Sequence, residues 1–580
     1  MTTHRGLLNP FYKMAHRSRH CTPADMQQLT LHCSDKPNDP PLLDLDAISR
    51  LAANSKSVHA QRWPLLRRLV SDASLYEEIC SQPAQNAKDA NITADDHVMM
   101  MQSGKFAPLD GDARRLSTVF TVPEHAKKRR RVILWPPQLN TELQRFFEKF
   151  DIDISDGVMY ARDLVPGQWA VACDLTKSFW QVPLAPEVQP FYAYRHAGNL
   201  YCHTVLPMGV VFAPALMQCI TSLLAEHGRT DVVTQVHIDN VRFVGPKESV
   251  IAAHRHFVAQ CEAARVTLGV EPNKYHPAFR ADAPPGQVPL LSEPHQIGEF
   301  CGTVTNYVDA TVRVADKIIV KLREDFRLCN VPGSSIRDVQ ILFGRLFYAS
   351  RVLRIGLAKY YFALKFYRRA MNRLSHIIDH EKPITMWTSA YRLIENWIAE
   401  LAVNSPVRHL PLHMTPQGMQ RLLVIATDAS TTGWGAVLCD EASGYFTSAG
   451  GKWDQPHTSS EINNLEVDAI RNAFDIFRNR IVELAPNAIV VLVDNTSAQA
   501  AVRKGYSPSE VMNASVLRAL QSLGTLPTHI EVRTSYINTH ENVADELSRG
   551  LPVNPQKLRE MGVVGRKLAG LCASVSLRAV

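Results

Sequence analysis

The spacing of apolar and polar positions changes along the chain, and each change indicates a different kind of structure. From about residue 106 to 300, short runs rich in β-branched and aromatic residues alternate with stretches of helical periodicity. The spacing is helical from about 301 to 405, and strand-like runs alternate with helical stretches again from about 420 to 552. Residues 1–105 are mixed and polar, with helical patches. The pattern therefore predicts a multidomain α/β protein with a helical segment in its middle.

Composition narrows the picture only a little. A chain of 580 residues is long enough for several domains, and its net charge of +7 is compatible with a polyanionic partner. The 11 cysteines include no CxxC pair, which favours free thiols in a reducing compartment over a disulfide framework. No window approaches about 18 uninterrupted apolar residues, so we expect no membrane span. These features predict an intracellular protein of the nucleus or cytoplasm.

Two acidic side chains stand at the ends of apolar runs in the first α/β stretch. The run "WAVACD" predicts a strand that ends at Asp174, and "TQVHIDNVRFVG" predicts two strands joined by a tight turn at Asp239 and Asn240. Asp and Asn suit such a turn because they tolerate positive φ. Two such carboxylates can meet across a sheet and hold the divalent cations of phosphoryl transfer. Taken alone, however, an Asp at a strand end is more commonly a turn or cap residue.

The last α/β stretch contains a second set of acids. Asp428 and Asp494 each end an apolar strand-like run, Glu466 lies in the first turns of an expected helix, and Asp545 precedes another. Carboxylates at two strand ends and on two helices can cluster at one edge of a sheet, which again suits two-metal chemistry. His540 lies five residues before Asp545. Any one of these acids alone is more commonly a helix cap or a surface charge.

The order of several motifs resembles that of a reverse transcriptase. "RRRVILWPPQLN" is similar to the fingers motif, "CDLTKSFWQVPL" to the first palm motif, and "LPMGVVFAP" to the LPQG-x-x-x-SP motif. "HIDN" stands where the family has Y-x-D-D, "VEPNKYHP" offers a lysine beside the triphosphate, and "GEFCGTV" resembles the primer grip. The resemblance implies a right-hand polymerase of fingers, palm and thumb with a small antiparallel palm sheet, followed by a helical connection.

The same resemblance assigns roles to individual residues. Asp174 and Asp239 would be metal ligands, and Asn240 would stand beside them in the catalytic turn. Phe179 would be the steric gate that excludes ribonucleotides, although an aromatic residue at such a place is normally core packing. The other substrate-binding residues that it implies are Arg131, Met208, Gly209 and Lys274. Arg131 also ends the basic run of residues 127–131, which alone suggests a solvated face or an import signal.

The chain departs from the family pattern at three positions. Met208 replaces the usual Gln, Ala213 replaces Ser, and Asn240 replaces the second Asp of the turn. An amide oxygen can ligate a cation but brings no charge. Asn240 therefore predicts a weakened but competent site, which prefers Mn²⁺ to Mg²⁺. The loss of the amide at Met208 puts nucleotide affinity or fidelity in doubt.

The order Asp428, Glu466, Asp494 and Asp545 resembles the metal-binding quartet of an RNase H-like α/β domain, and His540 its mobile histidine. The phrases "DASTTGWGAVL" and "HENVADELSR" are similar to long-terminal-repeat and DIRS-like, tyrosine-recombinase retroelements, of the VIPER type. The resemblance implies an RNA- and DNA-directed DNA polymerase with RNase H activity. Its partners would be an RNA template, a DNA primer, the RNA–DNA hybrid and dNTPs, with two Mg²⁺ or Mn²⁺ ions in each active site. The alternative is a catalytically silent or nuclease-only protein that binds RNA.

These inferences give an expected domain plan. Residues 106–300 would hold the fingers and palm, 301–405 the helical thumb and connection, and 420–552 the RNase H domain. Residues 1–105 would be a region of unknown role, and 553–580 a basic C-terminal tail.

Overall fold

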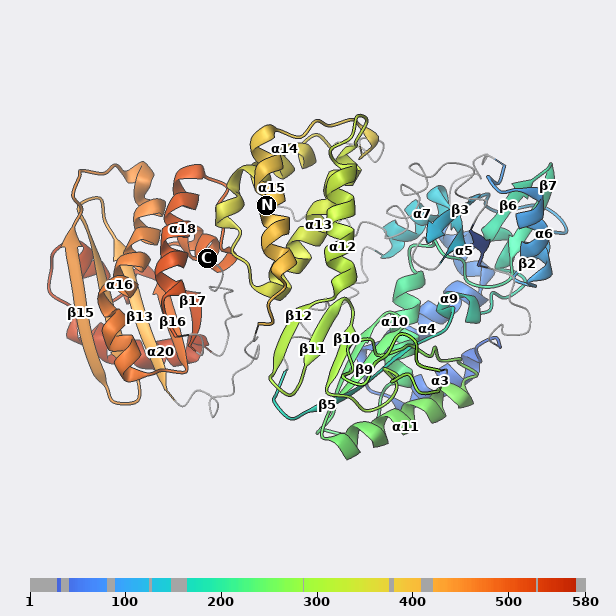
Figure 1. Ribbon diagram of the computed structural model, residues 1–580, viewed down its shortest axis with the longest axis horizontal. Coiled ribbons are helices and arrows are strands. Elements are labelled where there is room, and N and C mark those ends of the chain that lie inside the picture. The colour runs from blue at the N-terminus through green and yellow to red at the C-terminus, as the bar shows by residue number, and fades with distance from the viewer. Residues whose placement is uncertain are drawn as a thin grey trace. The chain divides into compact units, whose positions relative to one another are not determined.

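A computed structural model describes residues 29–32, 41–80, 89–124, 128–147, 164–284, 286–374, 380–407, 421–527 and 530–569. The chain forms two compact units (Figure 1). The first consists of Met1–Asp156 and Gly167–Cys301, and the second of Gly157–Pro166 and Gly302–Val580. Each is described by itself below.

The first unit mixes short strands with helices. Its strands are β1 (Thr30–Leu31), β2 (Phe106–Pro108), β3 (Thr118–Glu124), β4 (Arg129–Trp135), β5 (Trp169–Asp174), β6 (Ala193–His196), β7 (Asn199–His203), β8 (Val233–His237), β9 (Asn240–Gly245) and β10 (Ile297–Phe300). Its α-helices are α3 (Leu45–Asn54), α4 (Val58–Ser71), α5 (Ala73–Ile79), α6 (Ala94–Gln102), α7 (Pro137–Phe147), α9 (Ser178–Gln181), α10 (Ala213–Leu224) and α11 (Lys247–Ala263).

The central sheet of this unit has the strand order β5-β9-β8 and is antiparallel throughout. Alternate residues of β5 and β9, such as Val171, Cys173, Val241 and Phe243, are buried in one core. The helices α10 and α11 contribute to that core, as do α3, α4 and α5. Residues 41–80, which lie within the region of unknown role, are therefore built into the same unit as the acidic strand ends.

The first unit also contains two smaller sheets, each of three strands. β3 pairs antiparallel with β4, to which β1 adds in parallel, and β2, β7 and β6 form another three-stranded sheet. Arg130 on β4 donates through both terminal nitrogens to the buried carboxylate of Asp96 on α6, at 2.6 and 2.8 Å. A bidentate pair of this kind fixes the helix against the strand.

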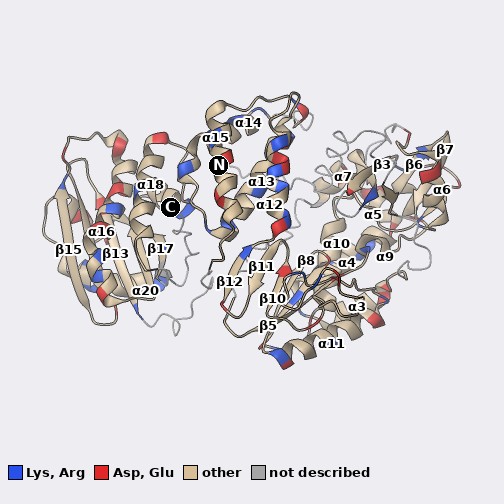
Figure 2. Cartoon of the chain, viewed as in Figure 1, with Lys and Arg blue, Asp and Glu red and all other residues tan. Residues whose placement is uncertain are grey.

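The second unit begins with a hairpin and a group of helices. Its elements before residue 407 are β11 (Thr303–Asn306), β12 (Thr311–Val314), α12 (Asp316–Leu328), α13 (Ile336–Leu353), the 3₁₀ helix η5 (Ala358–Tyr360), α14 (Tyr361–Met371) and α15 (Thr388–Val403). Ser335 and Asp338 form a reciprocal capping box that starts α13. Charged residues of both signs lie along α12 (Figure 2), so this helix presents no surface of a single sign.

The rest of the second unit is a five-stranded sheet covered by helices. Its strands are β13 (Leu422–Ala429), β14 (Gly433–Asp440), β15 (Tyr445–Lys452), β16 (Ala488–Val493) and β17 (Glu531–Tyr536), in the order β15-β14-β13-β16-β17. Its α-helices are α16 (Ile462–Leu484), α17 (Thr496–Lys504), α18 (Glu510–Gly524), α19 (Asp545–Ser548) and α20 (Pro555–Ala569). β13 pairs antiparallel with β14 and parallel with β16, and β16 pairs parallel with β17.

Alternate residues of β13 point to opposite faces of this sheet. Leu423 and Ile425 share a core with α16, α17 and α18, whereas Leu422 and Val424 share another with α20. The contact with α20 is close, because a Cβ at Gly565 would lie 2.3 Å from the side chain of Val424. α20 therefore covers the second face of the sheet (Figure 1).

The expected fold class, a multidomain α/β chain with small sheets, a helical segment and a second α/β part, is confirmed. The expected domain limits stay predictions. Two observations bear on them: residues 41–80 share a core with the central sheet, and residues 555–569 of the expected tail form a packed helix. The end of that tail, residues 570–580, and Lys127 of the basic run lie outside the described residues.

Candidate active sites

The turn between β8 and β9 lies one residue earlier than the sequence predicted. His237 pairs with Asn240, so Ile238 and Asp239 form the connection and Asn240 is the first residue of β9. The positive φ of the turn, 60°, belongs to Ile238, and neither Asp239 nor Asn240 has one. The expectation was wrong because it chose the turn residues by their propensity, whereas strand register places the turn here.

The sheet brings the acidic turn next to the strand end that holds Asp174. Asp174 pairs with Asn240 across β5 and β9, and the backbone N–H of Leu175 donates to the carbonyl of Asp239 at 3.0 Å. Both carboxylates are half-buried. Gly269 lies against Asp174, since a Cβ there would meet Asp174 Oδ2 at 3.5 Å.

The carboxylate of Asp239 is held by two side chains. The Ser178 hydroxyl donates to Oδ2 at 2.8 Å, and the Asn240 amide donates to Oδ1 at 2.9 Å. Together the two hydrogen bonds fix the orientation of the carboxylate. Asn240 therefore does here what an ionised second Asp could not do, since its amide donates a hydrogen bond to the neighbouring carboxylate.

Phe179 and Met208, two of the predicted substrate-binding residues, pack in one small apolar cluster. The buried members are Val122, Ile133 and Met208, and the half-buried rings of Phe120 and Phe179 pack against them. Met208 is 7% exposed. Met208 thus belongs to the buried group against which Phe179 packs, a place that suits a thioether better than the amide of a glutamine.

Gly209, the next predicted residue, must be a glycine. Its φ is +119°, and a Cβ would lie 1.8 Å from the carbonyl oxygen of Leu134. Asn140 fastens the same loop: its amide donates to the Gly209 carbonyl at 2.8 Å and accepts from the Val211 N–H at 2.9 Å. The start of α7 and the segment before α10 are thus joined through one buried side chain.

The two predicted cationic residues differ in their surroundings. Arg131 lies on β4 and forms an ion pair with Glu124 Oε1 at 2.6 Å, while Glu124 also binds Arg129. Lys274 is exposed, directly after Asn273, which is fully buried and donates to the Ile297 carbonyl at 2.8 Å. Asn273 therefore fixes the backbone that holds Lys274 at the surface.

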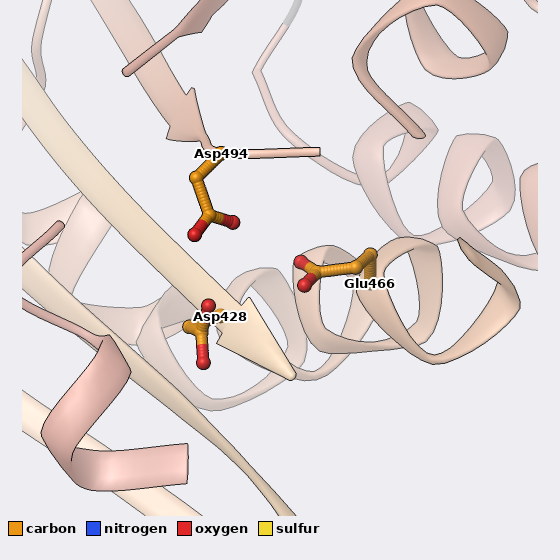
Figure 3. Close-up of side chains that lie close together, drawn as sticks. All are labelled: Asp428, Glu466 and Asp494. Carbon is orange, nitrogen blue, oxygen red and sulfur yellow. The ribbon is translucent and has the colours of Figure 1, made fainter. Parts of the chain in front are cut away.

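Three acids of the last α/β part come together. Asp428 is near the end of β13, Asp494 directly follows β16, and Glu466 lies on α16. One oxygen of each lies within 4.8 Å of the others, and the three carboxylates point toward one another (Figure 3). The parallel pairing of β13 and β16 causes this, because it brings both strand ends to one edge of the sheet.

Ionisation of all three acids at once is unfavourable, so their pKa values are raised. Burial and the charges of Asp428 and Asp494 raise the pKa of Glu466 to about 9. Burial, together with the charges of Asp494 and Asp545, raises the pKa of Asp428 to about 7, although Ser548 and Arg549 act against this rise. The pKa of Asp494 is also raised, mainly by burial, while the Thr539 hydroxyl opposes the rise.

The triad fits a divalent cation. Glu466 Oε2 is buried and has no hydrogen-bond partner, so one oxygen is left with an unused lone pair. Three hard oxygen ligands in a small volume are the set that Mg²⁺ and Mn²⁺ accept. A cation there would replace the protons that the raised pKa values hold on these acids.

Asp545 and His540, the remaining predicted residues of this site, are not part of the triad. Asp545 begins α19 and accepts from Arg549 at 2.7 Å. α19 lies directly on β14, since a Cβ at Gly435 would meet Leu547 Cβ at 2.5 Å. His540 is exposed in a short 3₁₀ helix, η8 (Thr539–Glu541).

Sequence reasoning missed the amides that hold both sites in place. Asn542 is fully buried, donates to the Thr427 carbonyl at 3.0 Å and accepts from the Ala544 N–H at 3.1 Å, which joins the loop of His540 to the strand of Asp428. Asn140 and Gln218 act similarly in the first unit. Only Gln218 has a sequence signal, because it is a polar side chain in the apolar stretch "APALMQCITSLL" and requires a hydrogen-bond partner once buried.

Comparisons with known proteins agree with part of this picture. Residues 122–288 match the family described as "Reverse transcriptase (RNA-dependent DNA polymerase)". Among curated proteins, none matches the chain. Asp174, Asp239 and Asn240 lie within the matched segment, and so do all members of the apolar cluster except Phe120.

Solved structures give only distant similarities. A foamy viral protease-reverse transcriptase in complex with double-stranded DNA is 12% identical, with 84% of this chain and 81% of that chain covered and a TM-score of 0.42. The foamy viral protease-reverse transcriptase in complex with an RNA/DNA hybrid is 13% identical, with 85% and 63% covered and a TM-score of 0.43. Nothing in these matches distinguishes the VIPER-type or DIRS-like subtype, which stays a prediction. Within the described residues, no helix is long and apolar enough to cross a membrane.

Proposed function

We propose that the chain is an RNA- and DNA-directed DNA polymerase with RNase H activity, encoded by a retroelement of the long-terminal-repeat or DIRS-like kind. It would copy element RNA into DNA and degrade the RNA of the resulting hybrid. The observation that carries the proposal is the presence of two separate acidic sites in one chain. One lies in the segment that matches reverse transcriptases, and the other is the buried triad of the five-stranded sheet.

In the first site, Asp174 and Asp239 would hold two divalent ions, Mg²⁺ or Mn²⁺. The chemistry that such ions supply is a lowered pKa of the attacking hydroxyl and compensation of phosphate charge. Ser178 and Asn240 keep the Asp239 carboxylate oriented. Phe179 would close the space next to the sugar and so select dNTPs, while Arg131 and Lys274 would meet the triphosphate.

In the second site, Asp428, Glu466 and Asp494 would hold the ions for phosphodiester hydrolysis, with Asp545 as a further ligand. His540, exposed on its loop, would assist product release. The substrate would be an RNA–DNA hybrid, because only its RNA strand has 2′-hydroxyl groups. Removing that strand frees the new DNA to become a template, which explains why one chain would hold both activities.

A second candidate is a nuclease-only protein whose polymerase site is silent. The observation in its favour is Asn240, which brings an uncharged amide where the reverse transcriptase pattern has a carboxylate. Against it stand the two hydrogen-bond donors to Asp239 and the buried Gln218, which binds the backbone of the turn.

The two activities are tested on one set of variants. Purified wild type is given a primed RNA template with dNTPs, and separately a labelled RNA–DNA hybrid, each with Mg²⁺ and with Mn²⁺. Asp174→Asn is expected to lose synthesis and keep cleavage, and Asp494→Asn the reverse. Cleavage without synthesis by wild type would favour the nuclease-only candidate. Absence of both activities would contradict the proposal.

A further inference from the structure

The turn that presents Asp239 contains a residue in an unfavourable backbone conformation. Ile238 has a φ of +60° in a two-residue hairpin connection. Glycine, asparagine or aspartate normally occupies such a position, because a β-branched side chain clashes with the backbone there. A conformation of this kind persists only where the surroundings hold it, and such strain is found mostly at functional sites.

One buried side chain holds this turn. Gln218 lies on α10 and is 6% exposed. Its Oε1 accepts from the backbone N–H of Ile238 at 2.6 Å, and its Nε2 donates to the carbonyl of Val236 at 3.2 Å. The amide therefore binds the backbone on both sides of His237. Its third contact, with the Ser222 hydroxyl at 3.4 Å, stays within α10.

Gln218 is rigidly placed. The described neighbours on α10 from Ala215 to Leu224 are buried in the core that also contains β5 and β9. Because the helix and the sheet are packed in one core, the amide of Gln218 has a fixed position relative to the sheet. Its hydrogen bonds therefore hold the backbone of the turn in place. Without it, the Ile238 N–H would lose its acceptor, and the backbone could relax toward a more favourable φ.

We propose that Gln218 is a positioning residue for DNA synthesis: it holds Ile238 in the left-handed conformation and so keeps Asp239 between Ser178 and Asn240. Gln218 itself touches no substrate in this account. The inference rests on the proposed polymerase function of the same site. It adds that the geometry of the catalytic turn depends on an amide 20 residues earlier in the chain.

The test compares Gln218→Ala, Ile238→Gly and the double variant in primer extension on an RNA template. Gln218→Ala is expected to lower kcat about tenfold to a hundredfold with little change in the KM for template-primer, because a small misplacement of a catalytic group has effects of this size. Glycine adopts a φ of +60° without cost. The double variant is therefore expected to recover most of the kcat that Gln218→Ala loses.

Ser222→Ala serves as the matched control, because it removes the contact of Gln218 that does not involve the turn. It is expected to leave kcat unchanged. Hydrogen exchange of the Ile238 amide gives a readout that is independent of activity, and Gln218→Ala is expected to speed this exchange while Ser222→Ala does not. A merely structural role of Gln218 would lower stability in both Gln218→Ala and the double variant, with no recovery of kcat.

The possible failures can be told apart. If wild type extends no primer in either metal, the proposed function fails and the positioning role fails with it. If wild type extends the primer and Gln218→Ala matches it, only the positioning role is overturned. The same holds if Gln218→Ala is impaired and Ile238→Gly restores nothing.

Discussion

The side-chain amide of Asn240 donates a hydrogen bond to the carboxylate of Asp239 at 2.9 Å. The two residues are neighbours in the chain, at the point where the turn enters β9. In the sequence, Asn240 suggested only a weakened metal site, because an amide oxygen brings no charge. In the structure, it also holds the Asp239 carboxylate in place, together with the Ser178 hydroxyl.

Asn240→Ala therefore should impair synthesis, although alanine removes no charge. Loss of one hydrogen bond to a charged group corresponds to about 1.5–3 kcal/mol, or roughly tenfold to a hundredfold in kcat if it acts fully on the transition state. Primer extension under single-turnover conditions measures this. Wild-type kcat in Asn240→Ala would contradict the supporting role, while a lower metal requirement in Asn240→Asp would show what the missing charge costs.

The apolar cluster that Phe179 shares with Met208 leads to a prediction about sugar selection. Phe179→Val should admit ribonucleotides, because the ring that would exclude the 2′-hydroxyl is lost. The variant should still use dNTPs. Competition between dNTP and rNTP on the same primer measures the selectivity. Phe120→Val is the matched control, because Phe120 is the other half-buried ring of the cluster. Equal loss of selectivity in both variants would mean that cluster packing, and not the gate, decides the sugar.

The buried triad makes the stability of the metal-free protein depend on pH. In the unfolded chain, these acids titrate near their ordinary pKa of about 4. The pKa of Glu466 is raised to about 9 in the folded protein, mainly by burial, so the folded state holds a proton that the unfolded chain has lost. The free energy of unfolding should therefore fall as the pH rises from about 4 to 9.

Thermal unfolding in EDTA across this pH range measures the effect, and Glu466→Gln should flatten the slope for the transition of the second unit. Mg²⁺ should restore stability at high pH, because the cation takes the place of the protons. A slope that is equal in wild type and Glu466→Gln would contradict the burial of an ionisable cluster. If Mg²⁺ stabilised Glu466→Gln as much as wild type, the ion would have to bind at another site.

The ion pair of Arg549 leads to a prediction about the affinity for Mg²⁺, because this cation competes with a metal ion for Asp545. It binds Asp545 at 2.7 Å, and Asp545 is the one acid of the expected quartet that lies outside the triad. Arg549→Gln should tighten Mg²⁺ binding about threefold to fivefold, a modest effect because exposed charges are screened by solvent. Calorimetric titration measures it. Lys557→Gln is the matched control, since Lys557 binds Glu546 on the same helix at 2.9 Å, and equal tightening in both would indicate a general charge effect only.

Local sequence patterns predicted the strands and the acidic residues that lie at their ends. Asp174, Asp428 and Asp494 follow or end apolar runs, and a strand that ends at a sheet edge places such an acid without further information. Glu466 could be predicted because its helix must cover the sheet with its apolar side, which turns the acid toward the strand ends.

Contacts between distant segments could not be predicted in this way. The turn residue Ile238 follows from strand register, and its support by Gln218 requires the packing of α10 on the sheet. Asn140 and Gly209 are 69 residues apart, and only the folded chain brings them together. The packing of α19 on β14 likewise depends on the close approach at Gly435, more than 100 residues earlier in the chain. Of these two buried amides, only Gln218 has a sequence signal, as a polar residue in an apolar stretch.

The central claim is that Asp174 and Asp239 form a working polymerase site despite Asn240. The most direct measurement is primer extension on an RNA template by wild type and Asp239→Ala, in Mg²⁺ and in Mn²⁺. We expect synthesis by wild type, stronger in Mn²⁺, and none by Asp239→Ala, while both cleave the RNA of a hybrid equally. No synthesis by wild type in either metal, or equal synthesis by both proteins, would contradict the account.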